Sequence, residues 1–240
     1  NALLSVIDAT NSYRSRRHVT SSFTGMKFNY THGDGTSRPQ YSAQLSAPVQ
    51  FKRETLSYDR DGHYYRKRNS VLFEPTMIFT YQNTDSTGTR YASLTYGTSQ
   101  SESDLSTLLA IRDDSNPLVV TLGNPNLKKS RDHYVNFMVS SFSTAHQLFT
   151  NAELSYHTTR NAIATSVLYD KATGKTTTQQ VNINGNWGAS GNCGLSVPLD
   201  KNQHLSLQEE LACDYNRSVD LTSVSGLVPE KSKVNNWDLQ

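Results

Sequence analysis

Hydrophobic and polar residues alternate with a period of two over much of this 240-residue chain. Between residues 41 and 51 the odd positions are Tyr, Ala, Leu, Ala, Val and Phe, whereas the even positions are mostly Ser and Gln. The same alternation runs through residues 71–81, 148–156 and 205–215. Because successive side chains of a strand point to opposite faces, the pattern predicts β-strands with one apolar and one polar face.

Turn-forming residues separate these strands, and the connections alternate between short and mostly long. Short connections are expected at residues 32–39, 83–88, 143–146 and 198–203. The other connections are expected at residues 58–69, 100–130, 171–175 and 224–233. Short connections at one end and long ones at the other are typical of up-and-down barrels in outer membranes. Soluble sandwiches instead show turn signals about every 8–12 residues.

Two segments, residues 147–169 and 176–197, contain no strong strand breaker other than glycine. At roughly 3.3 Å per residue, each is longer than the roughly 9–11 residues that a tilted strand needs to cross a bilayer. The apolar parity switches between Tyr156 and Ile163, which indicates a bulge or a strand leaving the membrane. Nine strands are predicted in all, an odd number that does not close a bacterial barrel.

The composition supports a folded, polar β protein. Charged residues make up 18%, hydrophobic residues 35%, and the mean hydropathy is −0.61, yet there are 13 Tyr. Such a chain is unlike a disordered segment or a helical bundle. It contains no apolar run of about 18 residues that could form a transmembrane helix. The net charge of +2 argues against a dedicated nucleic-acid-binding protein.

The ends of the sequence suggest a segment of a larger protein. Residue 1 is Asn rather than Met, and the last residues, 235–240, resemble a strand that has only begun. We therefore expect residues 1–240 to form a single β-barrel segment of a larger barrel, with no plug domain within them.

The long connection contains the most specific motif, residues 121–130, with the sequence TLGNPNLKKS. It resembles the Gly-Asn-Pro-(Asn/Asp)-Leu-Lys-Pro-Glu segment of TonB-dependent outer-membrane receptors and related outer-membrane β-barrel proteins of the Bacteroidetes type. Lys129 and Ser130 depart from the Pro and Glu usual in that segment. Two flanking pieces also resemble this family: a leucine-bearing loop before the motif, and residues 181–185 after it. The matching motif residues are Gly123, Asn124, Pro125, Asn126 and Leu127.

The resemblance implies an all-β fold, an antiparallel up-and-down meander of long strands forming part of a transmembrane β-barrel in the cell outer membrane. It implies a receptor or transporter for an unknown small nutrient, without a cofactor. The implied partners are outer-membrane lipid and, through the full-length protein, a plug domain and the TonB system; nucleic acid is not expected. Pro125 fixes its own φ and biases Asn124 towards extended geometry, so we interpret the motif as structural.

Ligand contacts are expected in the outer loops, at residues 58–69 and 100–123. The candidate ligand-binding residues are Tyr64, Tyr65, Arg66, Arg112 and Asp113. Basic residues gather at Arg14, Arg16, Arg17 and residues 64–68, and we expect them to contact lipopolysaccharide or substrate rather than nucleic acid.

No enzyme or metal site is expected. The seven His residues lack the tight spacing of metal ligands, and no Gly-x-Ser-x-Gly motif is present. Adjacent carboxylates such as Glu209 and Glu210 point to opposite faces of a strand, which excludes a catalytic pair. Cys193 is expected to face about Gln208 and Cys213 about Gly188. This offset of about five residues is too far for a disulfide, so two free thiols are predicted.

The alternative is a soluble or secreted β-sandwich for adhesion or carbohydrate binding, which the low hydropathy favours. The two can be distinguished by their apolar faces. In a sandwich these faces point at each other across two sheets, whereas a barrel wall carries one continuous belt with aromatic residues at its margins.

Overall fold

The computed structural model describes residues 13–35, 38–60, 62–200, 204–224 and 230–240. Regular structure in these ranges is almost entirely β-strand, with one turn of 3-10 helix, η2, at Ser106–Leu108. No helix in the described ranges is long and apolar enough to span a bilayer. The strands are β1 Arg14–His32, β2 Gln40–Asp59, β3 His63–Phe73, β4 Thr76–Asp85, β5 Gly88–Ser101, β6 Arg112–Asn116, β7 Val119–Leu122, β8 Ser130–Ser143, β9 Leu148–Arg160, β10 Ala162–Tyr169, β11 Thr176–Ile183, β12 Asn186–Pro198, β13 Ser206–Val224 and β14 Glu230–Leu239.

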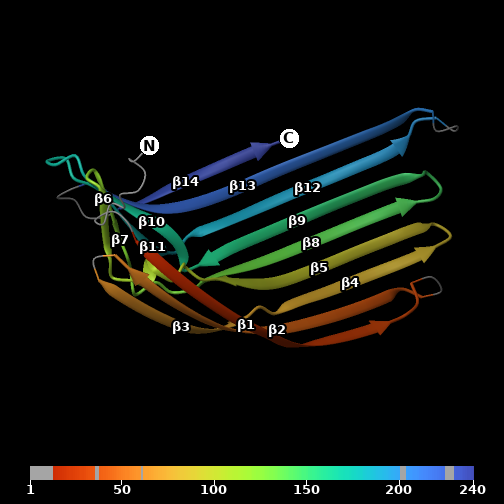
Figure 1. Cartoon of the computed structure of the whole chain (residues 1–240). Coiled ribbons are helices and arrows are strands. Elements are labelled where there is room, and N and C mark those ends of the chain that lie inside the picture. The colour runs from red at the N-terminus through yellow and green to blue at the C-terminus, as the bar shows by residue number, and fades with distance from the viewer. Residues whose placement is uncertain (1–12, 36–37, 61, 201–203, 225–229) are drawn as a thin grey trace, which may run out of the picture.

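These strands form a single 14-stranded sheet (Figure 1). Its main path, β1-β2-β4-β5-β8-β9-β12-β13, is antiparallel throughout, with β14 beside β13 and β3 beside β2. The predicted all-β antiparallel meander is therefore confirmed. Two parallel pairings, β10 with β13 and β11 with β7, depart from a pure meander. The described strands do not divide into two facing sheets, so the sandwich alternative is wrong.

The two ends of the sheet differ as predicted. The chain reverses briefly between β1 and β2, β4 and β5, β8 and β9, and β12 and β13, all at the end drawn on the right of Figure 1. The long connection from β5 to β8 lies at the opposite end. The predicted connections at 32–39, 198–203 and 224–233 fall partly outside the described residues. The predicted loop 58–69 is wrong: Tyr58 pairs with Tyr64, and β3 follows β2 almost at once.

The predicted strand at residues 71–81 is divided into β3 and β4. Both pair with β2 in one continuous register, since Val49 lies opposite Phe73 and Ser46 opposite Thr76. The interruption falls at Pro75, whose nitrogen has no hydrogen to donate to a neighbouring strand. Interruptions of this kind, together with the short strands of the long connection, explain why 14 strands occur where nine were predicted.

The predicted strands 147–169 and 176–197 are divided as well, at Asn161 and Gly185. The register between the two segments is continuous across these breaks, because Thr159 pairs with Asn186 in β9–β12 and Ala162 pairs with Ile183 in β10–β11. Asn161 has a φ of 53°, which turns the chain out of the wall. The β10–β11 hairpin then lies between β13 and β7 and buries Ala162, Ile183 and Val219 together. The switch of apolar positions predicted between Tyr156 and Ile163 therefore coincides with a change of strand direction at Asn161.

One face of the sheet, called here the outer face, carries an apolar belt. In the pairing of β1, β2 and β4, Phe28, Leu45 and Met77 lie side by side and are all exposed. The belt on β2 runs from Tyr41 to Phe51, about 34 Å at roughly 3.4 Å per residue. At a strand tilt of about 45° this gives about 24 Å, the height of the apolar band of outer-membrane barrels.

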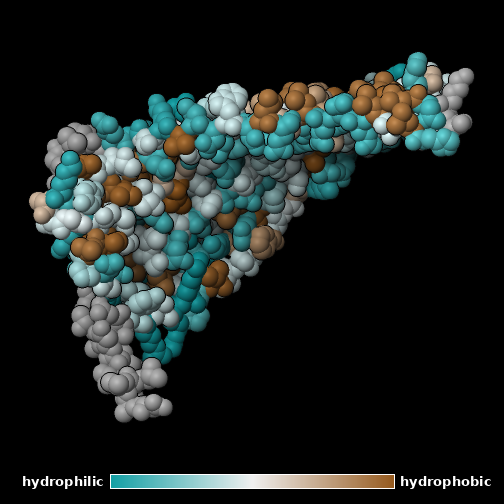
Figure 2. Space-filling model, turned by 90° about the horizontal axis from the view of Figure 1, so that it is seen from above, coloured by the Kyte–Doolittle hydropathy of each residue, from teal (hydrophilic) through white to brown (hydrophobic). Residues whose placement is uncertain are grey.

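Aromatic side chains mark both margins of the belt. Towards the long-loop end, Tyr156, Trp187, Tyr215 and Trp237 form a ladder across four strands, with ring centroids 6.0, 4.6 and 4.4 Å apart. Towards the short turns, Tyr41 and Tyr81 lie 5.3 Å apart. Figure 2 shows hydrophobic side chains gathered along the arm of the sheet that leads to the short turns. This is the continuous belt with aromatic margins expected of a barrel wall.

The opposite, inner face of the wall is largely polar. Asn136, for example, donates to Glu153 Oε1 at 2.6 Å across β8 and β9. Cys193 and Cys213 lie on the outer face and are both free, as predicted. Their expected register is wrong, because Cys193 pairs with Leu211 and Cys213 with Gly191, an offset of two residues. Pro198 lies opposite Ser206, three residues further along the chain than the expected register would place its partner.

Candidate functional site

The long connection, residues 102–129, folds back across the inner face of the sheet. Its 3-10 turn carries Leu105, Leu108 and Leu109, all nearly inaccessible to solvent. They pack against Leu56, which belongs to β2, so a segment of the loop is fixed to the inner wall. Burial of Leu side chains of this kind stabilises by about 2 kcal/mol each.

The loop can pack on β2 because the alternation of apolar and polar positions along this strand inverts after Phe51. In the belt the apolar residues of β2 occupy odd positions, but beyond it the apolar residues are Leu56 and Tyr58 and the outward positions are polar. The apolar face of β2 thus changes from the lipid side to the lumen. The inversion occurs where the belt ends and the loop begins to cover the strand.

A buried carboxylate, Glu54, holds the loop and the wall together. Its side chain is 0% exposed. Glu54 Oε1 lies 2.6 Å from Arg17 Nη2 and 3.1 Å from Lys52 Nζ, and Arg68 donates to Oε2. Three strands therefore bring cations to one anion. Arg17 also donates to Asp104 in the loop at 2.8 Å, which links the loop to the cluster.

The surroundings of Glu54 strongly favour its charged form. Burial raises the pKa of the carboxyl, but the hydrogen bonds from Arg17, Arg68 and Lys52 outweigh burial and lower it to about 2. Glu54 lies three residues beyond the belt, outside the membrane-spanning part of β2. Glu54 is therefore charged at neutral pH.

Glu102 adds a second buried carboxylate at the start of the loop. It is 3% exposed and lies 3.5 Å from Lys52 Nζ, 3.6 Å from Arg68 Nη2 and 3.9 Å from Lys129 Nζ. Its oxygens accept no hydrogen bond in the described part of the chain. Glu102 thus balances the cations without being held by them as tightly as Glu54 is.

The Gly-Asn-Pro motif fixes the far end of the loop. A Cβ on Gly123 would lie 1.6 Å from the Leu109 carbonyl oxygen, so only glycine allows this close approach. The Asn124 backbone N–H donates to Thr107 O at 2.6 Å, and its side-chain amide donates to Gln180 O at 2.8 Å. The motif therefore joins the 3-10 turn to β11.

Asn126 and Leu127 complete the motif as a compact turn. The Asn126 N–H donates to Asn124 Oδ1 at 3.0 Å, and Leu127 packs on the leucine cluster. Pro125 lies between them, where its fixed φ suits a turn. All five motif residues thus lie at the join between the loop and the wall, in contacts that support the structural interpretation.

Asparagines of β11 and of the segment after it link the motif to the bend in the wall. Asn182 Oδ1 accepts from Lys128 N–H at 2.7 Å, and its amide donates to Lys128 O and to Asn161 O, each at 2.9 Å. Asn184 Oδ1 accepts from Asn161 N–H at 2.7 Å. The residues that turn β10–β11 out of the wall are therefore the ones that hold the loop.

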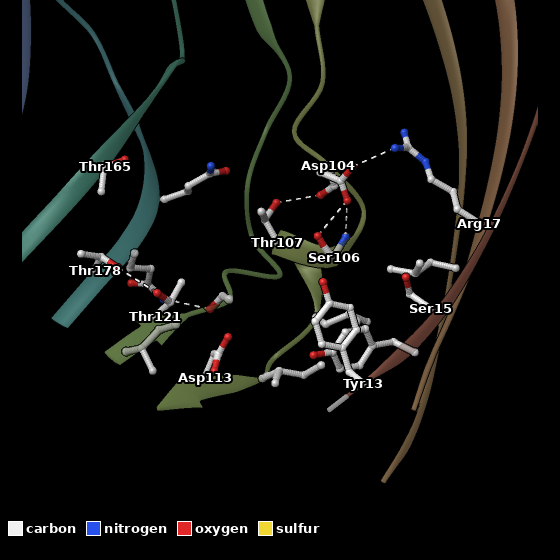
Figure 3. Close-up of a pocket in the computed structure, with 18 residues that line it drawn as sticks. Tyr13, Ser15, Arg17, Asp104, Ser106, Thr107, Asp113, Thr121, Thr165 and Thr178 are labelled. Carbon is white, nitrogen blue, oxygen red and sulfur yellow. Dashed lines mark hydrogen bonds and ion pairs between the residues drawn. The ribbon is translucent and has the colours of Figure 1, made fainter. Parts of the chain in front are cut away.

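A cavity of about 560 Å³ lies between the loop, β1 and the β10–β11 hairpin. Figure 3 shows Arg17 and Ser15 on one side, Thr165 and Thr178 on the other, and Asp104, Ser106 and Thr107 between them. Tyr13 and Tyr58, which also line it, stack with ring centroids 5.1 Å apart. The walls thus combine hydroxyl and amide groups with one aromatic pair.

The charges at this cavity are compensated in pairs. Asp104 accepts from Arg17 at 2.8 Å and from the N–H and hydroxyl of Ser106, each at 2.8 Å. Asp113 accepts from Arg60 Nη1 at 2.8 Å and from the Ser115 hydroxyl at 2.6 Å. The hydrogen bonds from Ser115 and Arg60 lower the pKa of Asp113 to about 2. Neither carboxylate is left to attract a cation.

The five candidate ligand-binding residues are only partly brought together. Asp113 lines the cavity, and Tyr64 lies nearby on the inner face, 6.4 Å from Tyr58 between ring centroids. Arg66 is exposed on β3, and Arg112 pairs with Asp114 at 3.5 Å. Tyr65 points to the outer face and is 61% exposed, so it lies away from the cavity.

Sequence reasoning named Arg17 only as one of a group of basic residues, and it missed three other residues that organise the site: Glu54, Glu102 and Thr178. The signal available for Glu54 was the inversion of the apolar pattern along β2. Nothing local marks Thr178, because its place depends on the long-range pairing of β11 with β7. In the described ranges, no group of three or more His, Cys, Asp or Glu side chains could hold a metal ion.

Comparison with known proteins identifies a family for this chain. The model of a family described as the outer membrane protein beta-barrel family matches residues 11–238. No curated protein and no solved structure matches this chain.

Proposed function

Because the chain belongs to the outer membrane protein beta-barrel family and so lies in the outer membrane, we propose that it is the barrel segment of a TonB-dependent receptor. The receptor takes up a small nutrient, with a plug domain and the TonB system as partners. The function is binding and passage, with no covalent bond made or broken. The support for coupling to TonB is the resemblance of residues 121–130 to the receptor motif.

The observation that carries the proposal is the cavity beneath the long loop. It lies at the long-loop end, which faces the outside in barrels of this type. A volume of about 560 Å³ suits a small molecule. A purely structural wall has no need of a loop fixed across its lumen by a buried ion cluster.

The lining favours a neutral, hydrogen-bonding solute. Asp104 and Asp113 are already paired with arginines, and the remaining polar groups are mainly hydroxyls and amides. The stacked Tyr13 and Tyr58 offer an apolar surface beside them. A strongly charged ligand would find no unpaired opposite charge among the described lining residues.

The test compares cells that carry the full-length protein, cells that lack its gene, and cells that lack TonB. Mass spectrometry of the spent medium identifies any solute that only the first strain removes. We expect such a solute, with removal lost in both mutants. Equal depletion by all three strains would contradict the proposal, and uptake that needs the gene but not TonB would contradict the coupling.

Point variants then locate the site. Asp113→Asn and Thr165→Val change the cavity lining, whereas Thr95→Val changes a β5 residue that does not line it. We expect the first two variants to slow removal of the solute at unchanged outer-membrane abundance, and the control to match the wild type. Unchanged uptake in both cavity variants would place the binding site elsewhere.

A further inference from the structure

We propose that the outer face carries a binding site for a phosphate-bearing lipid of the leaflet on the long-loop side. The site lies between β3 and β8 at the last residues of β5, where Gln100 pairs with Arg131, and has a volume of about 430 Å³. Its basic lining residues are Lys129, Arg131, His133 and Arg160, and its apolar ones are Val71 and Phe73. The inference depends on the barrel lying in the membrane and not on the proposed uptake.

The position of the site follows from the strand pairings. Val135 of β8 and Tyr156 of β9 are opposite each other and are the last apolar outward residues of their strands. Two residues further along each strand come His133 and Thr158, and the next outward pair is Arg131 and Arg160. The basic pair therefore lies just beyond the belt, at the depth of lipid headgroups.

Arg131 and Arg160 are direct cross-strand neighbours of like charge. Such a pair is destabilising unless an anion lies between the two groups. Both side chains are exposed, and neither forms an ion pair with a described residue. Asp132, the neighbour of Arg131 in sequence, points to the inner face, where its carboxylate accepts a hydrogen bond from the Thr159 hydroxyl. The outer face therefore presents a pair of guanidinium groups suited to a phosphate.

Lys129 also lines the site, although its Nζ lies 3.9 Å from the buried Glu102 and shares its charge with that carboxylate. Its Nζ donates to the Val71 carbonyl oxygen at 2.8 Å, which holds the side chain across the gap between β8 and β3. Lys129 stands where the resembling receptor motif has Pro. This cation is therefore a feature of this chain rather than of the motif.

The apolar lining gives the site its lipid character. Val71 and Phe73 are exposed on the outer face of β3 and continue the belt towards the long-loop end. A free phosphate would use only the cations, whereas a lipid can place its headgroup on the arginines and an acyl chain on Val71 and Phe73. Continuity with the belt therefore favours a lipid as the occupant.

A second basic group flanks the site on β2 and β3. Arg53 follows Phe51, the last belt residue of β2, and Lys67 lies diagonally across from it. Both are exposed, and a groove of about 320 Å³ lined by Phe51, Arg53 and Val71 lies beside Arg53; Val71 also lines the main site. Basic side chains at this level attract anionic lipid surfaces.

The test measures lipid binding to the purified full-length protein in detergent by native mass spectrometry. The probes are lipid A with its phosphates and the same lipid after dephosphorylation. The test variant is Arg131→Gln with Arg160→Gln. The matched control is Lys27→Gln with Arg90→Gln, which removes two positive charges outside the site.

We expect the wild type and the control to bind phosphorylated lipid A equally. The test variant is expected to bind about 25-fold more weakly, from roughly fivefold for each basic residue at a membrane surface. The dephosphorylated lipid should bind the wild type and the test variant alike. Equal binding of phosphorylated lipid by wild type and test variant would overturn the proposal. So would equal affinity of the site for inorganic phosphate and for phosphorylated lipid A, because the acyl contacts would then contribute nothing.

Discussion

Replacing Glu54 with Gln removes the charge at the centre of the ion cluster and keeps the size of the side chain. Arg17, Lys52 and Arg68 then lose their common hydrogen-bonding anion, and Glu102, at 3.5 Å or more, is too distant to replace it. Arg17 keeps Asp104, and Lys52 and Arg68 keep only the more distant Glu102, so part of the positive charge is left uncompensated, which is destabilising. The loop is expected to detach from the wall more often, while the belt strands remain paired.

The size of the effect follows from the pKa of Glu54. A decrease from 4.5 to about 2 corresponds to about 3 kcal/mol of preferential interaction with the charged carboxylate. Loss of one partner of a buried ion pair costs about 3–5 kcal/mol, which agrees. Because Arg17 is 41% exposed and partly screened, we take the lower value. This raises the open population of the loop about a hundredfold.

Hydrogen–deuterium exchange of the full-length protein measures this opening directly. The reporting amides are those of Leu109, Gly123 and Asn124, which donate to carbonyls within the loop. We expect their protection to fall about a hundredfold in Glu54→Gln at neutral pH. The control is Glu153→Gln, which removes a lumenal carboxylate remote from the loop. Protection within twofold of the wild type in Glu54→Gln would refute the role of the cluster.

Acid provides an independent test of the same reasoning. The pKa of Glu54 is lowered on folding, so its stabilisation is complete above about pH 4.5 and is lost as the pH falls towards 2. After correction for intrinsic exchange rates, opening of the wild-type loop should increase through this window. In Glu54→Gln the contribution from this group should be absent, so the two proteins should converge. Parallel pH profiles would contradict the assignment.

Three further outcomes are expected. Gly123→Ala should destabilise the loop, because its Cβ would collide with the Leu109 carbonyl oxygen, and the same exchange experiment measures this. Leu105→Ala should cost about 3 kcal/mol of loop stability, since the side chain is fully buried, whereas Leu118→Ala, at an exposed site, should cost little. In brominated lipid bilayers the emission of Trp187 and Trp237, measured as the difference from a double Phe variant, should be quenched; no quenching would contradict the outward position of the aromatic ladder.

Much of the wall could be predicted from the sequence because a barrel wall is governed by a local rule. Lipid on one side and water on the other impose a period of two, as at residues 41–51, and each strand carries that pattern by itself. The positions of the short turns followed for the same reason. The interruptions at Pro75 and Asn161 were harder to place, because the strand register continues through them.

The site could not be predicted in the same way, because its parts come from distant segments. In the sequence, nothing next to Glu54 distinguishes it from other polar residues of β2. Its role depends on Arg17 and Arg68, which neighbouring strands bring to it. The loop 58–69 was predicted from its run of charged and aromatic residues, yet those residues form a strand that extends beyond the membrane. A run of polar residues in a barrel sequence can therefore mark either a loop or a strand that extends beyond the membrane.

The inversion on β2 connects these observations. A strand that leaves the bilayer no longer needs an apolar outer face, so its outer positions become free for charged groups such as Arg53. Its inner positions become free for apolar contacts such as those of Leu56 with the loop. One change of parity therefore sets both the headgroup-level cations outside the wall and the anchored loop inside it. At this height along the barrel, the lipid contact lies outside the wall and the cavity lies inside it. Substitutions on the two faces of β2 should therefore affect lipid binding and loop opening independently.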